Sequence, residues 1–141
     1  MGLNFEGENV QWRQKLAQNL LAIGQARSQN DVAEALRFFH PEAIYRGNGW
    51  KGFQNVDVRG HEALRSMMWA IVIEYELLDI KFDIPLFDKD CVAFRRTVTL
   101  RNRGTGRGAQ VEICAFVRFR DNLIVEVGEW FDTLAMQQLN A

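Results

Sequence analysis

The last third of this chain, from Arg95 to Leu139, most constrains the fold, because it is typical of a meander of antiparallel strands. Two turn signals, Gly104-Thr105 and Asp121-Asn122, separate runs that are rich in Val, Ile, Phe, Thr and Arg. The final run reaches Asp132, two residues after an indole. The segment therefore predicts a sheet and a candidate site at its end, but it names no substrate.

Apolar residues at helical spacing predict three helices before the meander, over residues 9–27, 31–39 and 61–72. Asn30 or Asp31 is suited to cap the second helix, and His40-Pro41 is expected to end it. We also expect a short strand over 43–46, an irregular Gly- and Asn-rich loop over 47–57, a strand over 78–86 and a short helix over 134–139. This order predicts an α+β fold in which three helices cover one face of a curved antiparallel sheet.

Composition limits the class of protein. The 141 residues are 48% hydrophobic and 25% charged, which predicts one globular domain over 1–141. A net charge of −1 argues against general binding to nucleic acid or to a membrane surface. The chain shows neither a membrane span nor a signal peptide, so we expect a cytoplasmic protein with Cys91 and Cys114 reduced. Histidines and carboxylates lack metal-ligand spacing, so no metal is expected.

Register decides which side chains share a face of the meander. If each turn contains two residues, Arg96 faces Ile113, and Ile113 in turn faces Trp130. Asp132 then lies on the same face, which is otherwise apolar and belongs under the helices. Burying a charge is costly unless it is paired or used. Arg96 and Asp132 are therefore the leading candidates for a catalytic pair.

Each candidate also has a structural interpretation. Asp132 fits a general base whose pKa an apolar wall would raise, and it equally fits an N-cap of the terminal helix. Arg96 fits either an oxyanion-binding role or the neutralisation of Asp132. Tyr45 fits a hydrogen-bond donor to a carbonyl, although an aromatic residue on a short strand also fits the core. The other predicted ligand-binding residues are Asn48, Trp69, Phe94, Val98, Ile113 and Trp130.

The opposite face of the same strands predicts an interface. Cys114, Phe116 and Phe131 would be exposed together there, beside Thr97 and Thr99. Exposed apolar residues gathered on one surface are typical of an interaction site. We therefore expect a homodimer through the outer face of the sheet.

Three segments carry a resemblance to a known family: FHPEAIY over residues 39–45, RGHEAL over 59–64, and FRDNLIVEVGEWFD over 119–132, which runs into a helix over 134–139. They resemble the nuclear transport factor 2-like superfamily, and most of all its SnoaL-like and ketosteroid isomerase-like branches. The resemblance implies a cone-shaped fold with helices packed on the concave face of a curved, mixed sheet.

The resemblance also has implications for activity. It places Asp132 where SnoaL-like cyclases and limonene epoxide hydrolase-like enzymes have an acid-base aspartate, and Arg96 near the hydrolase's pocket arginine. Val98 stands where the hydrolase has a second aspartate, and Tyr45 and Asn48 are spaced differently from its tyrosine and asparagine, so water activation of that type is not expected. The implied function is a cofactor-free isomerase, cyclase or dehydratase acting on a small hydrophobic molecule that bears a carbonyl. The alternative is a non-catalytic ligand-binding or assembly module of the same fold.

Overall fold

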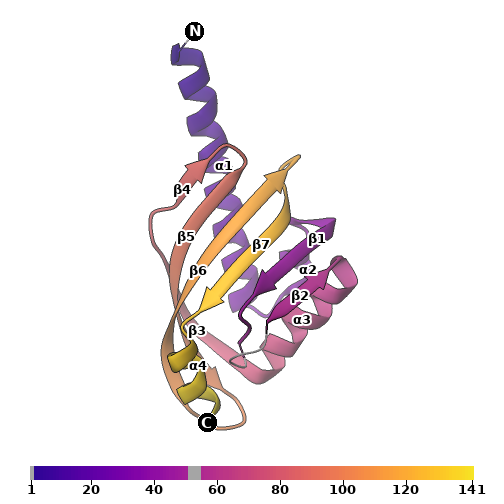
Figure 1. The fold of residues 1–141 in the computed structure, drawn as a ribbon, viewed down its shortest axis with the longest axis vertical. Coiled ribbons are helices and arrows are strands. Elements are labelled where there is room, and N and C mark those ends of the chain that lie inside the picture. The colour runs from indigo at the N-terminus through magenta and orange to yellow at the C-terminus, as the bar shows by residue number, and fades with distance from the viewer. Residues whose placement is uncertain (1, 51–54) are drawn as a thin grey trace.

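The computed structural model describes residues 2–50 and 55–141, with side chains from Val10 onward. Within these residues a strongly curved sheet wraps around one side of the helices, and the first turns of the long N-terminal helix extend beyond the sheet (Figure 1). In chain order the elements are α1 (Gly2–Ser28), α2 (Val32–Leu36), β1 (Phe39–Gly47), β2 (Val56–Arg59), α3 (His61–Glu74), β3 (Tyr75–Phe82), β4 (Leu86–Asp88), β5 (Cys91–Asn102), β6 (Gly108–Arg120), β7 (Leu123–Phe131) and α4 (Thr133–Asn140).

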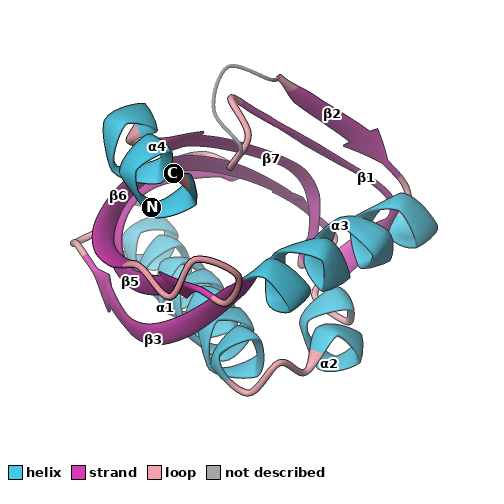
Figure 2. Ribbon diagram, turned by 90° about the horizontal axis from the view of Figure 1, so that it is seen from below, coloured by secondary structure: helices cyan, strands magenta, loops and turns pink. Residues whose placement is uncertain are grey.

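The sheet is mixed, and its strand order brings the first and last strands together. The order is β2-β1-β7-β6-β5-β3, with β4 paired to β5. Strands β1 and β7 run parallel, and the other pairs are antiparallel. Helices α1, α2 and α3 lie on the open side of the curve, while α4 packs against β6 and β5 (Figure 2). The predicted α+β fold with a curved, mixed sheet is confirmed. The expected short terminal helix is present as α4, whose Met136 and Leu139 join the buried cluster of the sheet.

The β5–β6 hairpin forms in the register that alternation predicts. Arg96 pairs with Ile113, and Val98 and Val111, which face the helices, are buried. The turn is longer than predicted, because Asn102 N–H donates to the carbonyl of Arg107 at 2.8 Å and leaves four residues between them. The extra residues are shared equally between the two strands, so the register is unchanged.

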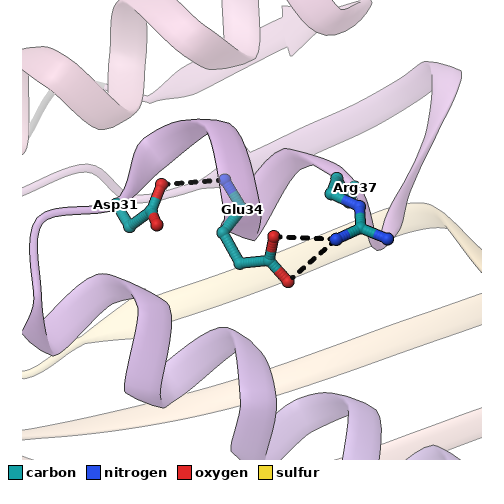
Figure 3. A network of polar contacts seen from close by, with 3 residues as sticks. All are labelled: Asp31, Glu34 and Arg37. Carbon is teal, nitrogen blue, oxygen red and sulfur yellow. Dashed lines mark hydrogen bonds and ion pairs between the residues drawn. The ribbon is translucent and has the colours of Figure 1, made fainter.

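Helix α2 is shorter than its apolar spacing predicts. Asp31 caps it by accepting a hydrogen bond from Glu34 N–H at 3.1 Å, and Glu34 pairs with Arg37 on the surface (Figure 3). The helix ends at Leu36, and β1 already begins at Phe39, so the prediction of helix up to residue 39 was wrong. The strand accommodates His40-Pro41 because the β1–β7 ladder is irregular between its first pair and the next.

Two other boundaries differ from the prediction. The strand expected over 78–86 is divided into β3, which follows α3 directly, and the short β4. Strand β2 occupies the end of the loop expected over 47–57, of which residues 51–54 lie outside the described part. No helix in the described ranges is both long and apolar enough to cross a membrane.

Candidate functional site

One extra residue in β7 decides which acid enters the site. The β6–β7 ladder starts in the predicted register, but a β-bulge before Glu126 shifts it by one residue. Ile113 therefore pairs with Phe131 and not with Trp130. Because side chains alternate along a strand, the shift moves each later side chain to the opposite face. Glu129 thus turns to the concave face, and the predicted arrangement of the end of this strand was wrong.

A cavity of about 150 Å³ lies between the concave face and the helices α1 and α3. Its wall is mostly apolar and comes from both helices and from strands β1, β3, β5, β6 and β7. Among the described residues that line it, three are charged, namely Arg27 of α1, Arg96 of β5 and Glu129 of β7. Charges at this position need partners, since an apolar wall gives them little solvation.

Glu129 holds the polar part of the cavity together. Its Oε1 accepts a hydrogen bond from the hydroxyl of Tyr45 at 2.6 Å, and its Oε2 lies 2.5 Å from Nη1 of Arg96. The side chains of Arg96 and Glu129 are only 18% and 12% exposed, so water screens this ion pair weakly. Both carboxylate oxygens therefore have a strong donor on the protein.

Protonation states follow from these contacts. Burial would raise the pKa of Glu129, but the charge of Arg96, the hydrogen bonds from Tyr45 and Arg96, and the charge of Arg27 together hold that pKa below its usual value. Burial and the adjacent Glu129 carboxylate raise the pKa of Tyr45 well above its usual value. At neutral pH the site thus contains an ionised carboxylate, a neutral phenol that donates to it, and two guanidinium groups.

A glycine makes the contact between Tyr45 and Glu129 possible. Gly47 pairs with Glu129 in the parallel β1–β7 ladder. A Cβ at this position would lie 2.1 Å from the backbone carbonyl oxygen of Glu129, far inside van der Waals contact. The absence of a side chain therefore lets β1 approach β7 closely, two residues from Tyr45.

Arg27 reaches the cavity from the helix layer. It continues the buried stripe of Leu16, Leu20 and Ile23 on α1. Its Nε is buried without a hydrogen-bond partner among the described residues. Burial lowers the pKa of Arg27, partly offset by the charge of Glu129.

Several residues predicted from the sequence line this cavity. Arg96, Tyr45, Phe94, Val98 and Ile113 all contribute to its wall. The prediction placed them under the helices because alternation from the first hairpin gives β5 and β6 their correct faces. Their contact with a ligand stays a prediction.

Asp132 and Trp130 lie elsewhere. The Asp132 side chain accepts a hydrogen bond from Ala135 N–H at 3.2 Å and caps α4, so the pairing predicted with Arg96 was wrong and the alternative capping role is what the structure shows. Trp130 is 52% exposed on the outer face, where its indole lies against Gly128. Both errors come from the single shift of register in β7.

Asn48 and Trp69 are also outside the cavity wall. Asn48 donates to the carbonyl of Phe131 and accepts from its N–H, both at 2.9 Å, so its amide extends the β1–β7 ladder in place of a peptide group. Trp69 is 44% exposed, because Leu64 and Met68 form the buried side of α3. Neither residue lines this cavity, and their contact with a ligand stays a prediction.

Glu129 and Arg27 were not predicted as site residues, although the sequence contained a signal for each of them. Leu123, Ile124 and Val125 are three consecutive apolar residues, which breaks strict alternation and is compatible with an extra residue before Glu129. Arg27 follows a spacing of four, three and four residues from Leu16, so it occupies the next position of an apolar stripe. A charge at such a position indicates a buried polar contact.

No metal site is apparent in the described residues, since they contain no group of three or more His, Cys, Asp or Glu side chains able to hold an ion. The cavity wall contributes one carboxylate together with two guanidinium groups and the phenols of Tyr45 and Tyr75. Guanidinium groups repel a cation, so this set of side chains suits an anion or a polarised carbonyl better than a metal.

Comparisons with known proteins agree with this architecture. A sequence model described as a SnoaL-like domain matches residues 21–127. No curated protein matches the chain significantly. One similar solved structure is a Bacillus subtilis protein provisionally named an isomerase, with a TM-score of 0.82 and 12% identity, covering 90% of this chain and 93% of that one. A second is an LEH-like epoxide hydrolase of M. tuberculosis, with a TM-score of 0.71 and 16% identity, covering 89% of this chain and 88% of that one. A third is a Xanthomonas campestris pv. campestris protein provisionally named a polyketide cyclase, with a TM-score of 0.72 and 18% identity, covering 88% of this chain and 98% of that one. At these identities the likeness shows the fold alone.

Proposed function

We propose that this chain, which belongs to the SnoaL-like domain family, binds a small carbonyl-bearing apolar molecule and moves a proton on it without a cofactor. The observation that carries the proposal is an ionised Glu129 in the wall of an otherwise apolar cavity, with Tyr45 and Arg96 as donors beside it. The provisional names of two similar structures, an isomerase and a polyketide cyclase, agree with chemistry of this class. In this proposal Glu129 takes the acid-base role that the sequence assigned to Asp132.

The chemistry requires a base and an oxyanion stabiliser. The Glu129 carboxylate would remove a proton from the carbon next to the carbonyl, so that a C–H bond breaks and an O–H bond forms on Glu129. Tyr45 and the remaining N–H groups of Arg96 would stabilise the enolate oxygen. Return of the proton to another carbon completes an isomerisation. Protonation of Glu129 removes its charge at the moment when the enolate appears, so the charge on Arg96 is then paired with the reacting molecule.

The size of the cavity limits the ligand. A volume of about 150 Å³ is similar to that of an engineered protein cavity that binds benzene. A cavity of this volume therefore fits a molecule with one ring better than a polycyclic one. We accordingly propose a monocyclic or similarly sized substrate.

A Glu129→Gln variant tests the proposal. It keeps the shape and a hydrogen-bond acceptor but removes the base. The probe is the β,γ-unsaturated isomer of cyclohexenone, whose conversion to the conjugated enone is followed by ultraviolet absorbance. We expect wild-type turnover above the buffer rate and a loss of about 100-fold or more in the variant.

A matched control is Glu126→Gln, which changes an acid on the same strand that pairs with Arg118 near the surface. Its turnover should equal that of the wild type. Equal turnover in wild type and Glu129→Gln would exclude Glu129 as the base. If the wild type binds the probe but does not convert it, the non-catalytic function below is favoured.

The second candidate function is ligand binding without catalysis. It is favoured by the contacts of Glu129, because both of its oxygens are already occupied and its pKa is lowered, which weakens it as a base. Under this function Glu129, Tyr45 and Arg96 only fix the shape of the cavity. Binding of the enone without turnover separates the two.

We also propose a homodimer through the outer sheet face. The bulge removes Phe131 from the predicted patch and adds Trp130, so the apolar residues there are Cys114, Phe116 and Trp130. Cys114 pairs directly with Trp130 across the β6–β7 ladder, which keeps the patch continuous. An exposed group of this kind is suited to a self-complementary contact.

A further inference from the structure

Arg27 is a partly buried cation that the proposed proton transfer does not use. It lies near the C-terminal end of α1 and lines the cavity from the helix side. Its Nε is shielded from solvent and has no hydrogen-bond partner among residues 10–50 and 55–141. A buried N–H of a charged group without an acceptor is costly, so its retention needs a reason.

The charges of the cavity do not balance. Arg27 and Arg96 contribute two positive charges, and Glu129 contributes one negative charge. Glu129 lies in ion-pair contact with Arg96, and Tyr45 donates a hydrogen bond to it and stays neutral. Arg27 has no ion pair within 4 Å among the described side chains, so it supplies the excess charge.

The excess charge matches one kind of ligand group. A guanidinium presents its N–H groups in a planar fork that fits both oxygens of a carboxylate. A single excess charge suits a monoanion, whereas a phosphate dianion would leave a net negative charge in an apolar cavity. The apolar wall and the volume of about 150 Å³ fit a body of about one ring beside that group.

We infer that the ligand of this cavity is a small cyclic carboxylate whose anionic group pairs with Arg27 while its apolar body fills the space toward β5 and β6. The inference rests on the proposed function in one respect, namely that the cavity is a ligand site. It adds the class of ligand and assigns Arg27 as the residue that selects it. Turnover by Glu129 is not required for it.

Binding of benzoate and of nitrobenzene tests the inference, because the two molecules have the same shape and only benzoate is charged. Calorimetry at neutral pH should show that the wild type binds benzoate at least about tenfold more tightly than nitrobenzene, as a charged hydrogen bond predicts. Arg27→Met should lose this preference and keep its affinity for nitrobenzene. Arg37→Met is the matched control, since Arg37 is exposed and pairs with Glu34, and it should behave as the wild type.

The outcomes separate this inference from the proposed function. Nitrobenzene binding without a preference for benzoate, or a preference that survives Arg27→Met, overturns the role of Arg27 and leaves the cavity as a ligand site. Failure of both molecules to bind overturns the inference, and turnover of the enone then decides the proposed function on its own.

A second measurement covers the case in which Arg27→Met does not fold. In the wild type, benzoate should shift the Nε–H resonance of Arg27, and nitrobenzene should leave it in place. That resonance is identified by its loss in Arg27→Lys, which keeps the charge without the planar fork. An unshifted resonance at saturating benzoate overturns the inference.

Discussion

The unequal charges of the cavity predict an unequal response to the removal of each partner of its ion pair. Glu129→Met would leave Arg96 and Arg27 buried together without a counter-charge. Arg96→Met would leave Glu129 with the hydrogen bond from Tyr45 and the attraction of Arg27. We therefore expect the first variant to lose more stability than the second.

The magnitudes follow from burial. The ion pair is at 2.5 Å, and its members are 18% and 12% exposed, so it belongs with buried pairs rather than with surface ones. Breaking a buried pair from one side costs about 3–5 kcal/mol, and we expect Glu129→Met near the top of that range, because two like charges remain. Arg96→Met should cost about 2–3 kcal/mol, the scale of one charged hydrogen bond.

The double variant Arg96→Met with Glu129→Met completes the cycle. It removes both charges of the pair and leaves Arg27 alone, so it should be less destabilised than Glu129→Met. The measurement is urea unfolding at neutral pH, followed by circular dichroism in all variants. If Arg96→Met costs as much as Glu129→Met, or the double variant costs the sum of the two, then the excess positive charge does not control the energetics of the cavity.

Three other outcomes are expected. The pKa of Glu129 is lowered in the folded state, so its ionisation stabilises the fold at pH values above the unfolded pKa of 4.5. This stability should be lost as the pH falls below 4.5 in the wild type but not in Glu129→Gln, as the midpoints of urea unfolding would show. Asp132→Ala should lower stability by about 1 kcal/mol through loss of the α4 cap and leave enone turnover unchanged, whereas a loss of turnover at equal stability would return Asp132 to the site. Trp130→Glu should convert a dimer to a monomer in light scattering, and a wild type that is monomeric at micromolar concentration contradicts the proposed interface.

How far the sequence predicts the structure depends on whether alternation continues without interruption. The β5–β6 hairpin was predicted residue by residue, from Arg96 opposite Ile113 outward, because both strands alternate regularly up to the turn. In β7 the pattern changes within the first few residues, and one extra residue moved Asp132, Trp130 and Glu129 together. A local uncertainty of one residue thus became an error about the whole end of the strand.

The helix layer was predicted less well for a different reason. Apolar spacing locates α1 and α3, but it does not show which polar residue on a helix turns inward. Arg27 could be placed only by comparing its position with the stripe of Leu16, Leu20 and Ile23, and its contact with the cavity also depends on how α1 lies across the sheet. That packing depends on the tertiary structure, for which the local pattern carries little information.

Strand β6 explains how residues from three separate parts of the chain form one site. Arg96 of β5 and Glu129 of β7 lie on opposite sides of β6, where they pair with Ile113 and Ala115 respectively. The ion pair between them therefore crosses β6 diagonally. Ala115 is buried and has only a methyl group, which leaves room for the long arginine side chain to pass over it. The parallel β1–β7 ladder then adds Tyr45 from the other side. The bulge and the small residue therefore act together, because the bulge turns Glu129 inward and Ala115 lets Arg96 reach it, and neither alone would give a paired carboxylate in the cavity wall.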